Sequence, residues 1–307
     1  MNTQSNAIPE SPLESQVIAP AVISATRPLY WSVRRELWEN RSIYIAPLAV
    51  AAIILFGFSI STIASIWHKA LRLDPAHRGV AMPYDMAAGL MMLTGILVSV
   101  FYCLDALHGE RRDRSILFWK SLPVSDWTTV LAKASIPLVL LPLLTFAITV
   151  ATQFIMLPIS SAALLGSGLN VGSLWTQLPL FQMSMLLLYH LVTAHTLWPA
   201  PIYCWLLLVS GWARRAPFLW AVLPLLAIGG VEKIAFQTSH FAAMVGFRII
   251  GNAPAVGFTG PDMFPTDPMT HITPGLFLTS PGLWIGLALA AAFLAAAVRL
   301  RRYQGPI

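Results

Sequence analysis

The densest group of ionisable side chains lies in residues 108–127, which read HGERRDRSILFWKSLPVSDW. Carboxylates and guanidinium groups stand side by side at its start, where the charged residues are Glu110, Arg111, Arg112, Asp113 and Arg114. Such charges, followed by apolar residues, can form a surface that binds a partner protein. They are equally compatible with a solvated loop that only fixes the topology of a membrane protein.

A short helix is predicted directly after these charges, over residues 115–122. Ile116 and Trp119 share one side of it, because they are three residues apart. Pro123 ends the helix, and the hydroxyl of Ser125 can cap the helix that follows. The segment therefore presents an apolar ridge beside dense charge.

Other ionisable residues lie inside apolar stretches. His190 and His195 are five residues apart, which places them about 140° apart on a helix rather than on one face. Helix packing is therefore favoured over metal binding for both. Glu232 and Lys233 lie near the outer end of an apolar stretch, so they are candidates for a substrate path. An interfacial position with snorkelling side chains is the simpler interpretation of this pair.

The composition assigns all these residues to a membrane protein. Hydrophobic residues make up 57% of the 307-residue chain and charged residues only 10%, whereas soluble domains carry about 25% charged residues. Several charge-free stretches reach the roughly 20 apolar residues that cross a bilayer core. We therefore predict an all-α polytopic membrane protein. The two cysteines, Cys103 and Cys204, lie in apolar runs and form no disulfide framework.

The predicted organisation has a tail, 1–26, and a transmembrane domain, 27–307. The tail is polar and is expected to be disordered in the cytoplasm. Six membrane spans are predicted, at about 44–67, 86–107, 129–157, 178–212, 218–236 and 283–298. The fourth stretch is too long for one straight crossing, and the WPAP run at 198–201 interrupts it, so we expect one kinked span with an extension at the outer interface. A linker is expected over 158–178.

Residues 28–42 predict a short helix that lies along the membrane surface before the first span. Val33 and Leu37 fall on its apolar face, and Glu36 falls on the opposite, polar face. Arg34 lies near the edge of the apolar face and would have to snorkel.

Most cations gather at one set of span ends. Fourteen of the nineteen share that side, namely Arg27, Arg34, Arg35, Arg41, Arg111, Arg112, Arg114, Lys120, Lys133, Arg214, Arg215, Arg299, Arg301 and Arg302. The positive-inside rule makes this side cytoplasmic and places both termini there. The net charge of +6 does not indicate a nucleic-acid binder, because the cations flank apolar stretches instead of forming one stripe.

Residues 109–133, GERRDRSILFWKSLPVSDWTTVLAK, resemble the loop after the second span in permeases of type-2 ABC transporters. The residues that carry the resemblance are Glu110, Arg111, Ser115, Ile116, Leu122, Pro123, Val124, Ser125 and Lys133. The chain departs from the pattern at Arg114, where many members have Gly, so the turn before the short helix is expected to differ.

The resemblance implies the membrane-spanning subunit of an ABC exporter in a bacterial inner membrane. A separate cytoplasmic ATPase would dock on the loop, which would act as a coupling helix, and two permease copies or two similar permeases would form the working unit. The residues implied to contact the ATPase are Glu110, Arg111, Arg112, Asp113, Phe118, Trp119, Leu122 and Pro123. In this family, the region matching 238–281 forms short re-entrant helices.

The sequence contains no G-x-x-x-x-G-K-[ST] phosphate loop, so ATP hydrolysis is expected in a partner subunit. No catalytic residue, metal or cofactor is expected. The sparse polarity inside the spans favours a lipid-like or amphipathic substrate. The alternatives are a membrane-embedded enzyme that uses His190, His195 or Glu232, and a passive channel or membrane anchor.

Overall fold

The structure, a computed structural model, describes residues 26–67, 78–121, 124–166, 172, 178–250, 274–303 and 305. Within these ranges every regular element is a helix. Six of the described helices are long and apolar enough to cross a membrane. The predicted class, an all-α polytopic membrane protein, is thus confirmed.

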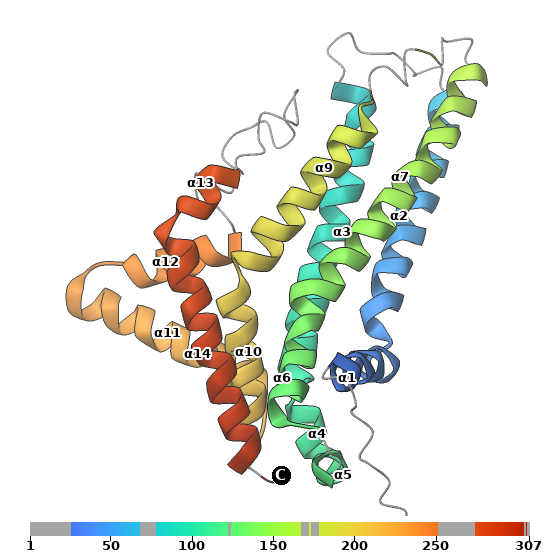
Figure 1. The fold of residues 1–307 in the computed structure, drawn as a ribbon. Coiled ribbons are helices and arrows are strands. Elements are labelled where there is room, and N and C mark those ends of the chain that lie inside the picture. Colours follow the sequence, from blue (N-terminus) through green and yellow to red (C-terminus); the bar gives the residue numbers. More distant parts are fainter. Residues whose placement is uncertain are drawn as a thin grey trace, which may run out of the picture.

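Three long helical rods form one half of the bundle (Figure 1). The first two are α2 (Ser42–Trp67) and α3 (Arg78–Asp105). The third is continuous and consists of α6 (Asp126–Ser135), the π-helix η1 (Ile136–Leu140) and α7 (Leu141–Gly166). These rods pack against one another along their apolar sides.

The third rod is longer than the sequence predicted. The first part of the expected linker over 158–178 is helical instead, because α7 continues through Pro158 to Gly166. An internal proline removes one helical hydrogen bond, but the extension buries Leu164 in a cluster with Tyr84 of α3. This packing offsets the cost of the proline.

The fourth apolar stretch runs between the two ends of the bundle as a broken rod (Figure 1). It consists of α9 (Leu180–His190), the π-helix η2 (Leu191–Leu197) and α10 (Ala200–Trp212). The break falls at Trp198 and Pro199, as expected from the WPAP run. Beside it, α14 (Pro281–Tyr303) packs along α10.

Arg248 of α12 (His240–Ile250) closes this break. Its guanidinium donates to the Trp198 carbonyl at 3.0 Å and also to the Gly282 carbonyl. It also stacks on the Trp198 indole, 4.3 Å from the ring centroid. Gly286 makes this position available, because a Cβ there would lie 2.6 Å from the guanidinium nitrogens. Arg248 of α12 thus supplies a hydrogen-bond donor to the break between η2 and α10, where the prolines interrupt the helix.

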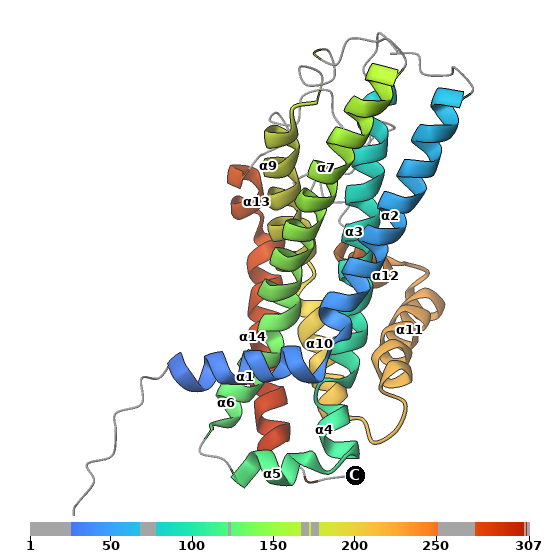
Figure 2. The same cartoon turned by 90° about the vertical axis from the view of Figure 1, so that its right-hand side faces the viewer.

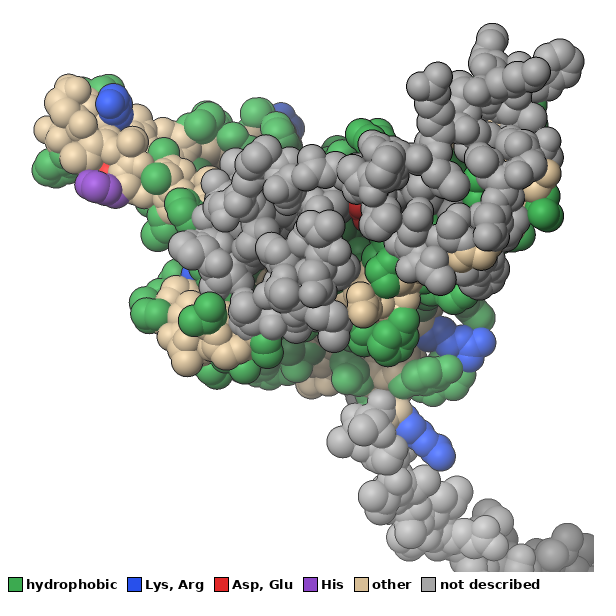
Figure 3. All heavy atoms as spheres, turned by 90° about the horizontal axis from the view of Figure 1, so that it is seen from above, with side chains coloured by type: hydrophobic (Ala, Val, Ile, Leu, Met, Phe, Trp, Pro, Cys, Tyr) green, Lys and Arg blue, Asp and Glu red, His purple; other side chains and the backbone are tan. Residues whose placement is uncertain are grey.

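The helix α11 (Pro217–Phe236) matches the predicted fifth span in extent but runs outward from the bundle, crosswise to the long rods (Figure 1). It is apolar on all sides, so no face is preferred for packing, and Ala221 is its only buried residue. Its start is held by Trp205, whose Nε1 donates to the Ala221 carbonyl at 3.1 Å. Seen from above, hydrophobic side chains lie at many places along the rim of the described part (Figure 3).

Three short helices lie across one end of the bundle (Figure 2). They are α1 (Thr26–Glu39), α4 (His108–Arg112) and α5 (Ser115–Ser121). The segments that carry the fourteen cations all meet there, so we call it the charged end. The remaining short helix, α13 (Pro274–Thr279), precedes α14 at the other end of that helix (Figure 1).

The orientation of α1 differs from the sequence prediction in one respect. Glu36, which was expected on the polar outer face, is only 2% exposed and faces the bundle together with Val33 and Leu37. The rings of Trp31 and Trp38 are exposed instead. Charged partners inside the bundle cause this reversal, and periodicity of polarity alone could not reveal them.

Candidate functional site

Four buried charged side chains from four helices meet inside the charged end. They are Glu36 of α1, Glu110 of α4, Lys133 of α6 and Arg301 of α14, and none is more than 6% exposed. Lys133 Nζ lies 2.8 Å from Glu36 Oε1 and 3.2 Å from Glu110 Oε1. Arg301 binds the other oxygen of Glu110 through Nη1. We call these four residues the ion cluster.

Two half-buried residues complete the charge balance around the ion cluster. Arg35 Nη2 lies 3.1 Å from Glu110 Oε1, and Asp126 Oδ1 lies 3.2 Å from Arg301 Nε. The six residues together comprise three carboxylates and three cations, so their formal charges cancel. Burial lowers the pKa of Arg35, but the neighbouring carboxylates of Glu39 and Glu110 outweigh it and hold that pKa above its ordinary value.

The ion cluster positions helices more than it adds stability. Desolvation of buried charges cancels much of their attraction, whereas loss of one partner leaves an uncompensated charge and costs about 3–5 kcal/mol. Tyr102 of α3 adds a further tie, because its hydroxyl donates to Glu36 Oε2 at 2.8 Å. The cluster therefore fixes the places of α1, α3, α4, α6 and α14 relative to one another.

The start of α4 is anchored on α10. Ser210 Oγ accepts hydrogen bonds from the backbone N–H groups of Leu107 and His108, both at 2.9 Å, and its side chain is fully buried. Arg111 donates to the carbonyl of Gly211, in the last turn of α10. Cations and donors at a helix C-terminus satisfy carbonyls that have no helical partner. These contacts hold α4 rigidly at the end of the bundle.

The turn from α4 to α5 contains a left-handed residue. Arg114 adopts φ 59°, a conformation that costs a residue with a side chain about 1–2 kcal/mol and that glycine adopts freely. This is the position at which the sequence departs from the ABC permease pattern, where many members have Gly. The backbone turn is thus of the kind that glycine favours, although an arginine occupies it.

The helix α5 displays an apolar surface away from the bundle. Ile116 anchors it with 2% exposure, whereas Leu117 and Phe118 are each 60% exposed. The Arg35 guanidinium carbon lies 3.2 Å from the centroid of the Trp119 ring. The Phe118 and Trp119 rings meet edge-on, with their centroids 4.8 Å apart. We call the two exposed residues, Leu117 and Phe118, the α5 face. Ser125 caps the following helix as predicted, accepting from the Thr128 N–H at 3.1 Å.

The eight residues predicted to contact an ATPase fall into three groups. Those that are buried and bind groups of this chain are Glu110 and Arg111. Those that reach the surface are Arg112, Asp113, Phe118 and the partly buried Trp119. Those outside the described residues are Leu122 and Pro123. Direct contact with a partner is thus open to the second group, whereas the first acts within the chain.

The predicted substrate-path residues, Glu232 and Lys233, lie near the C-terminal end of α11, close to the turn that leads to α12. The Glu232 carboxylate accepts from Thr238 Oγ1 at 2.9 Å and from the backbone N–H groups of His240 and Phe241 at 2.7 and 2.8 Å. It therefore caps the N-terminus of α12. Lys233 is exposed. Their part in a substrate path stays a prediction.

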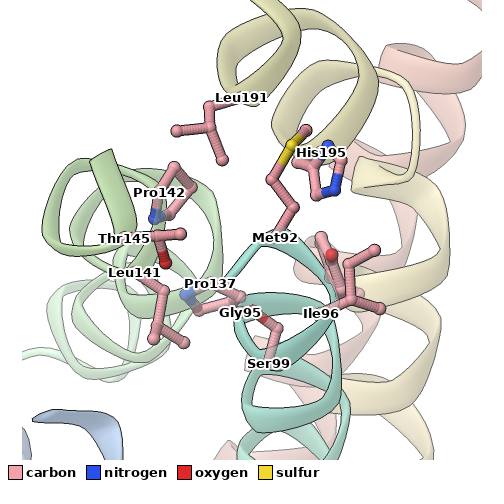
Figure 4. Close-up of a pocket in the computed structure, with 11 residues that line it drawn as sticks. Met92, Gly95, Ile96, Ser99, Pro137, Leu141, Pro142, Thr145, Leu191 and His195 are labelled. Carbon is pink, nitrogen blue, oxygen red and sulfur yellow. The ribbon is translucent and has the colours of Figure 1, made fainter. Parts of the chain in front are cut away.

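A small pocket lies where η1 and η2 face each other inside the bundle (Figure 4). Its volume is about 10 Å³, close to the space of one water molecule. Thr145 Oγ1 and His195 Nδ1 are buried there and have no hydrogen-bond partner among the described residues. His190 lies apart from this pair, with Nδ1 2.9 Å from the Leu186 carbonyl. The described residues hold no group of three or more His, Cys, Asp or Glu side chains placed to bind a metal ion.

Comparison with known proteins identifies no relative: no family model matches the sequence, and neither the curated proteins nor the solved structures give a match. The fold and its charged end therefore define the protein as a multi-pass, all-α membrane protein.

Proposed function

We propose that the protein is the membrane-spanning permease subunit of an ATP-driven ABC transporter, and that a separate cytoplasmic ATPase docks on α5. The observation that carries this proposal is the α5 face. Leu117 and Phe118 are exposed on a helix that lies across the end of the bundle, outside the apolar spans (Figure 2). Exposed apolar side chains at such a place are suited to a protein partner.

The ion cluster supports this proposal by connecting α5 to the spans. Glu110 lies five residues before Ser115, the first residue of α5, and binds Lys133 of the third span and Arg301 of α14. Movement of α5 by a partner would therefore be transmitted to α6 and α14 through buried ion pairs. Packed elements shift as units rather than deforming continuously.

The backbone conformation at Arg114 is a further support for the proposal of an ABC permease. Its positive φ is the conformation for which glycine is suited, and glycine is common there in the permeases that the loop resembles. In this proposal the charged end faces the cytoplasm of a bacterium, since cations mark the cytoplasmic side of inner-membrane proteins. Both termini would lie on that side.

We also propose a lipid-like or amphipathic substrate and a second permease, either another copy or a similar chain. The support is the placement of charge, because fourteen of the nineteen cations belong to segments that meet at the charged end. A wholly hydrophilic substrate would call for more charge along the spans. ATP-dependent transport of a small hydrophilic ion by the purified complex would contradict this choice.

The proposal is tested by co-expression of the tagged chain with ABC ATPases of the same organism. The expected result is a complex of equal numbers of both subunits, whose ATP hydrolysis in nanodiscs rises when a lipid substrate is added. Purification of the chain without any ATPase, or ion flux through it without ATP, would overturn the proposal. The second result would favour a passive channel.

A further inference from the structure

The outer face of α1 combines cations with aromatic rings. Four of its members recur at intervals of three or four residues and so share one face of the helix; they are Arg27, Trp31, Arg34 and Trp38, and the exposed Arg41 follows in the turn between α1 and α2. The two indole rings are 57% and 68% exposed. The buried Glu36 lies on the opposite face, so the outer face has three positive charges and no carboxylate.

Arg34 stands at the centre of this face. Its guanidinium lies 5.1 Å from the centroid of Trp31 and 4.9 Å from that of Trp38, between the two rings. In the described chain no carboxylate pairs with it, whereas the adjacent Arg35 pairs with Glu39 and Glu110. The guanidinium of Arg34 is therefore available to bind an anion.

The location of α1 indicates which anion this is. The helix lies across the charged end, and α2 begins at Ser42, directly after it (Figure 2). The outer face is thus level with the start of an apolar span, where the headgroups of a bilayer lie. Tryptophan is enriched at this level, and the anions present there are lipid phosphates. Arginine binds phosphate with two parallel hydrogen bonds.

We infer that the outer face of α1 is a binding site for the phosphate of an anionic membrane lipid, with Arg34 as its centre. Trp31 and Trp38 hold the guanidinium and cover the glycerol region of the lipid. Arg27 and Arg41 add attraction for a net negative headgroup, so that phosphatidylglycerol is preferred over the zwitterionic phosphatidylcholine. The site does not depend on any ATPase.

Native mass spectrometry of the full chain in detergent tests this site, with phosphatidylglycerol, phosphatidylcholine or inorganic phosphate added at equal concentration. The wild type is expected to retain phosphatidylglycerol in preference to phosphatidylcholine. Arg34→Gln should weaken that retention about five-fold, as loss of one interfacial cation does. Arg215→Gln is the matched control, because it removes an exposed cation of the loop between α10 and α11, also at the charged end.

Equal retention of phosphatidylglycerol by the wild type and Arg34→Gln would overturn the inference. Equal retention of both lipids by the wild type would overturn it as well. Displacement of the lipid by inorganic phosphate would also contradict it, since it would indicate a site for a soluble anion. If Arg34→Gln unfolds early, Trp38→Leu gives the same test, because it removes one exposed ring beside the guanidinium and is expected to weaken retention.

Discussion

Lys133 and Glu36 form an ion pair 2.8 Å long in which both side chains are almost fully buried, at 3% and 2% exposure. The two residues are 97 positions apart and belong to α6 and α1. The pair ties a helix that lies across the charged end to a rod that runs the length of the bundle. Glu110 shares Lys133 Nζ at 3.2 Å, so the segment before α5 belongs to the same network.

Replacement of Lys133 by methionine should destabilise the protein strongly. The change leaves the carboxylates of Glu36 and Glu110 close together without their shared cation, which we expect to cost about 3–5 kcal/mol. Thermal unfolding in detergent measures the effect. The matched control is Lys120→Met on the exposed surface of α5, which should change stability by less than about 1 kcal/mol. Equal unfolding temperatures for the two variants would show that the ion cluster does not hold the helices.

Ser210→Ala should destabilise the junction of α3 and α4. It leaves the N–H groups of Leu107 and His108 without their acceptor in a buried place, at a cost of about 1–3 kcal/mol. Hydrogen exchange at these two amides should rise along with a fall in thermal stability. Ser121→Ala removes a hydroxyl that donates to the Phe118 carbonyl on the exposed surface, so it serves as the control. Unchanged exchange in Ser210→Ala would contradict the anchoring role.

Arg114→Gly should leave the stability unchanged or raise it by up to about 1 kcal/mol. Glycine relieves the left-handed backbone at φ 59°, while its greater freedom in the unfolded chain opposes part of the gain. Arg112→Gly, in the last turn of α4, should lower the stability instead because its backbone is helical. The measurement is the thermal unfolding of the two variants. A lower unfolding temperature for Arg114→Gly than for Arg112→Gly would contradict the left-handed turn at Arg114.

Gly286→Ala should loosen the contact between α12 and α14. The new methyl group would meet the Arg248 guanidinium at 2.6 Å and force it away from the Trp198 carbonyl. We expect a loss of about 1–3 kcal/mol in the wild-type background. In an Arg248→Ala background the same change should be neutral or stabilising, because alanine favours the helix. Equal effects in the two backgrounds would show that the two residues are not coupled.

Much of the fold follows from periodicity and charge scarcity. Long apolar runs predict the spans, and the WPAP run predicts the break that the structure shows at Trp198. The ends of the helices are harder to predict from the sequence. For example, α7 continues through Pro158 because the packing of Leu164 stabilises the longer helix. The inclination of α11 was also beyond the sequence, since a helix that is apolar on all sides gives no sign of its direction.

The sequence predicts the short helix of the candidate site but not the buried contacts around it. The dense charges at Glu110 indicated a special segment, and the short helix after them is present as α5. The burial of Glu110 could not be foreseen, because its partners Lys133 and Arg301 lie far along the chain. A signal for Lys133 existed, since it is a single cation among apolar residues of the third span. The prediction of Glu36 on the outer face is wrong, because a polar residue with charged partners inside the bundle can be buried.

The central claim, that an ATPase docks on the α5 face, is tested most directly by a quantitative co-purification of Phe118→Ala with that ATPase. Phe118 is 60% exposed, so its loss should not lower the thermal stability of the chain. The matched control is Phe181→Ala, which removes a 72% exposed phenylalanine from α9, at the other end of the bundle.

We expect Phe118→Ala to retain at most about one tenth of the ATPase bound by the wild type, as for an interface residue worth more than about 1.4 kcal/mol. Phe181→Ala should retain all of it. Equal retention by Phe118→Ala and the wild type would contradict docking on the α5 face.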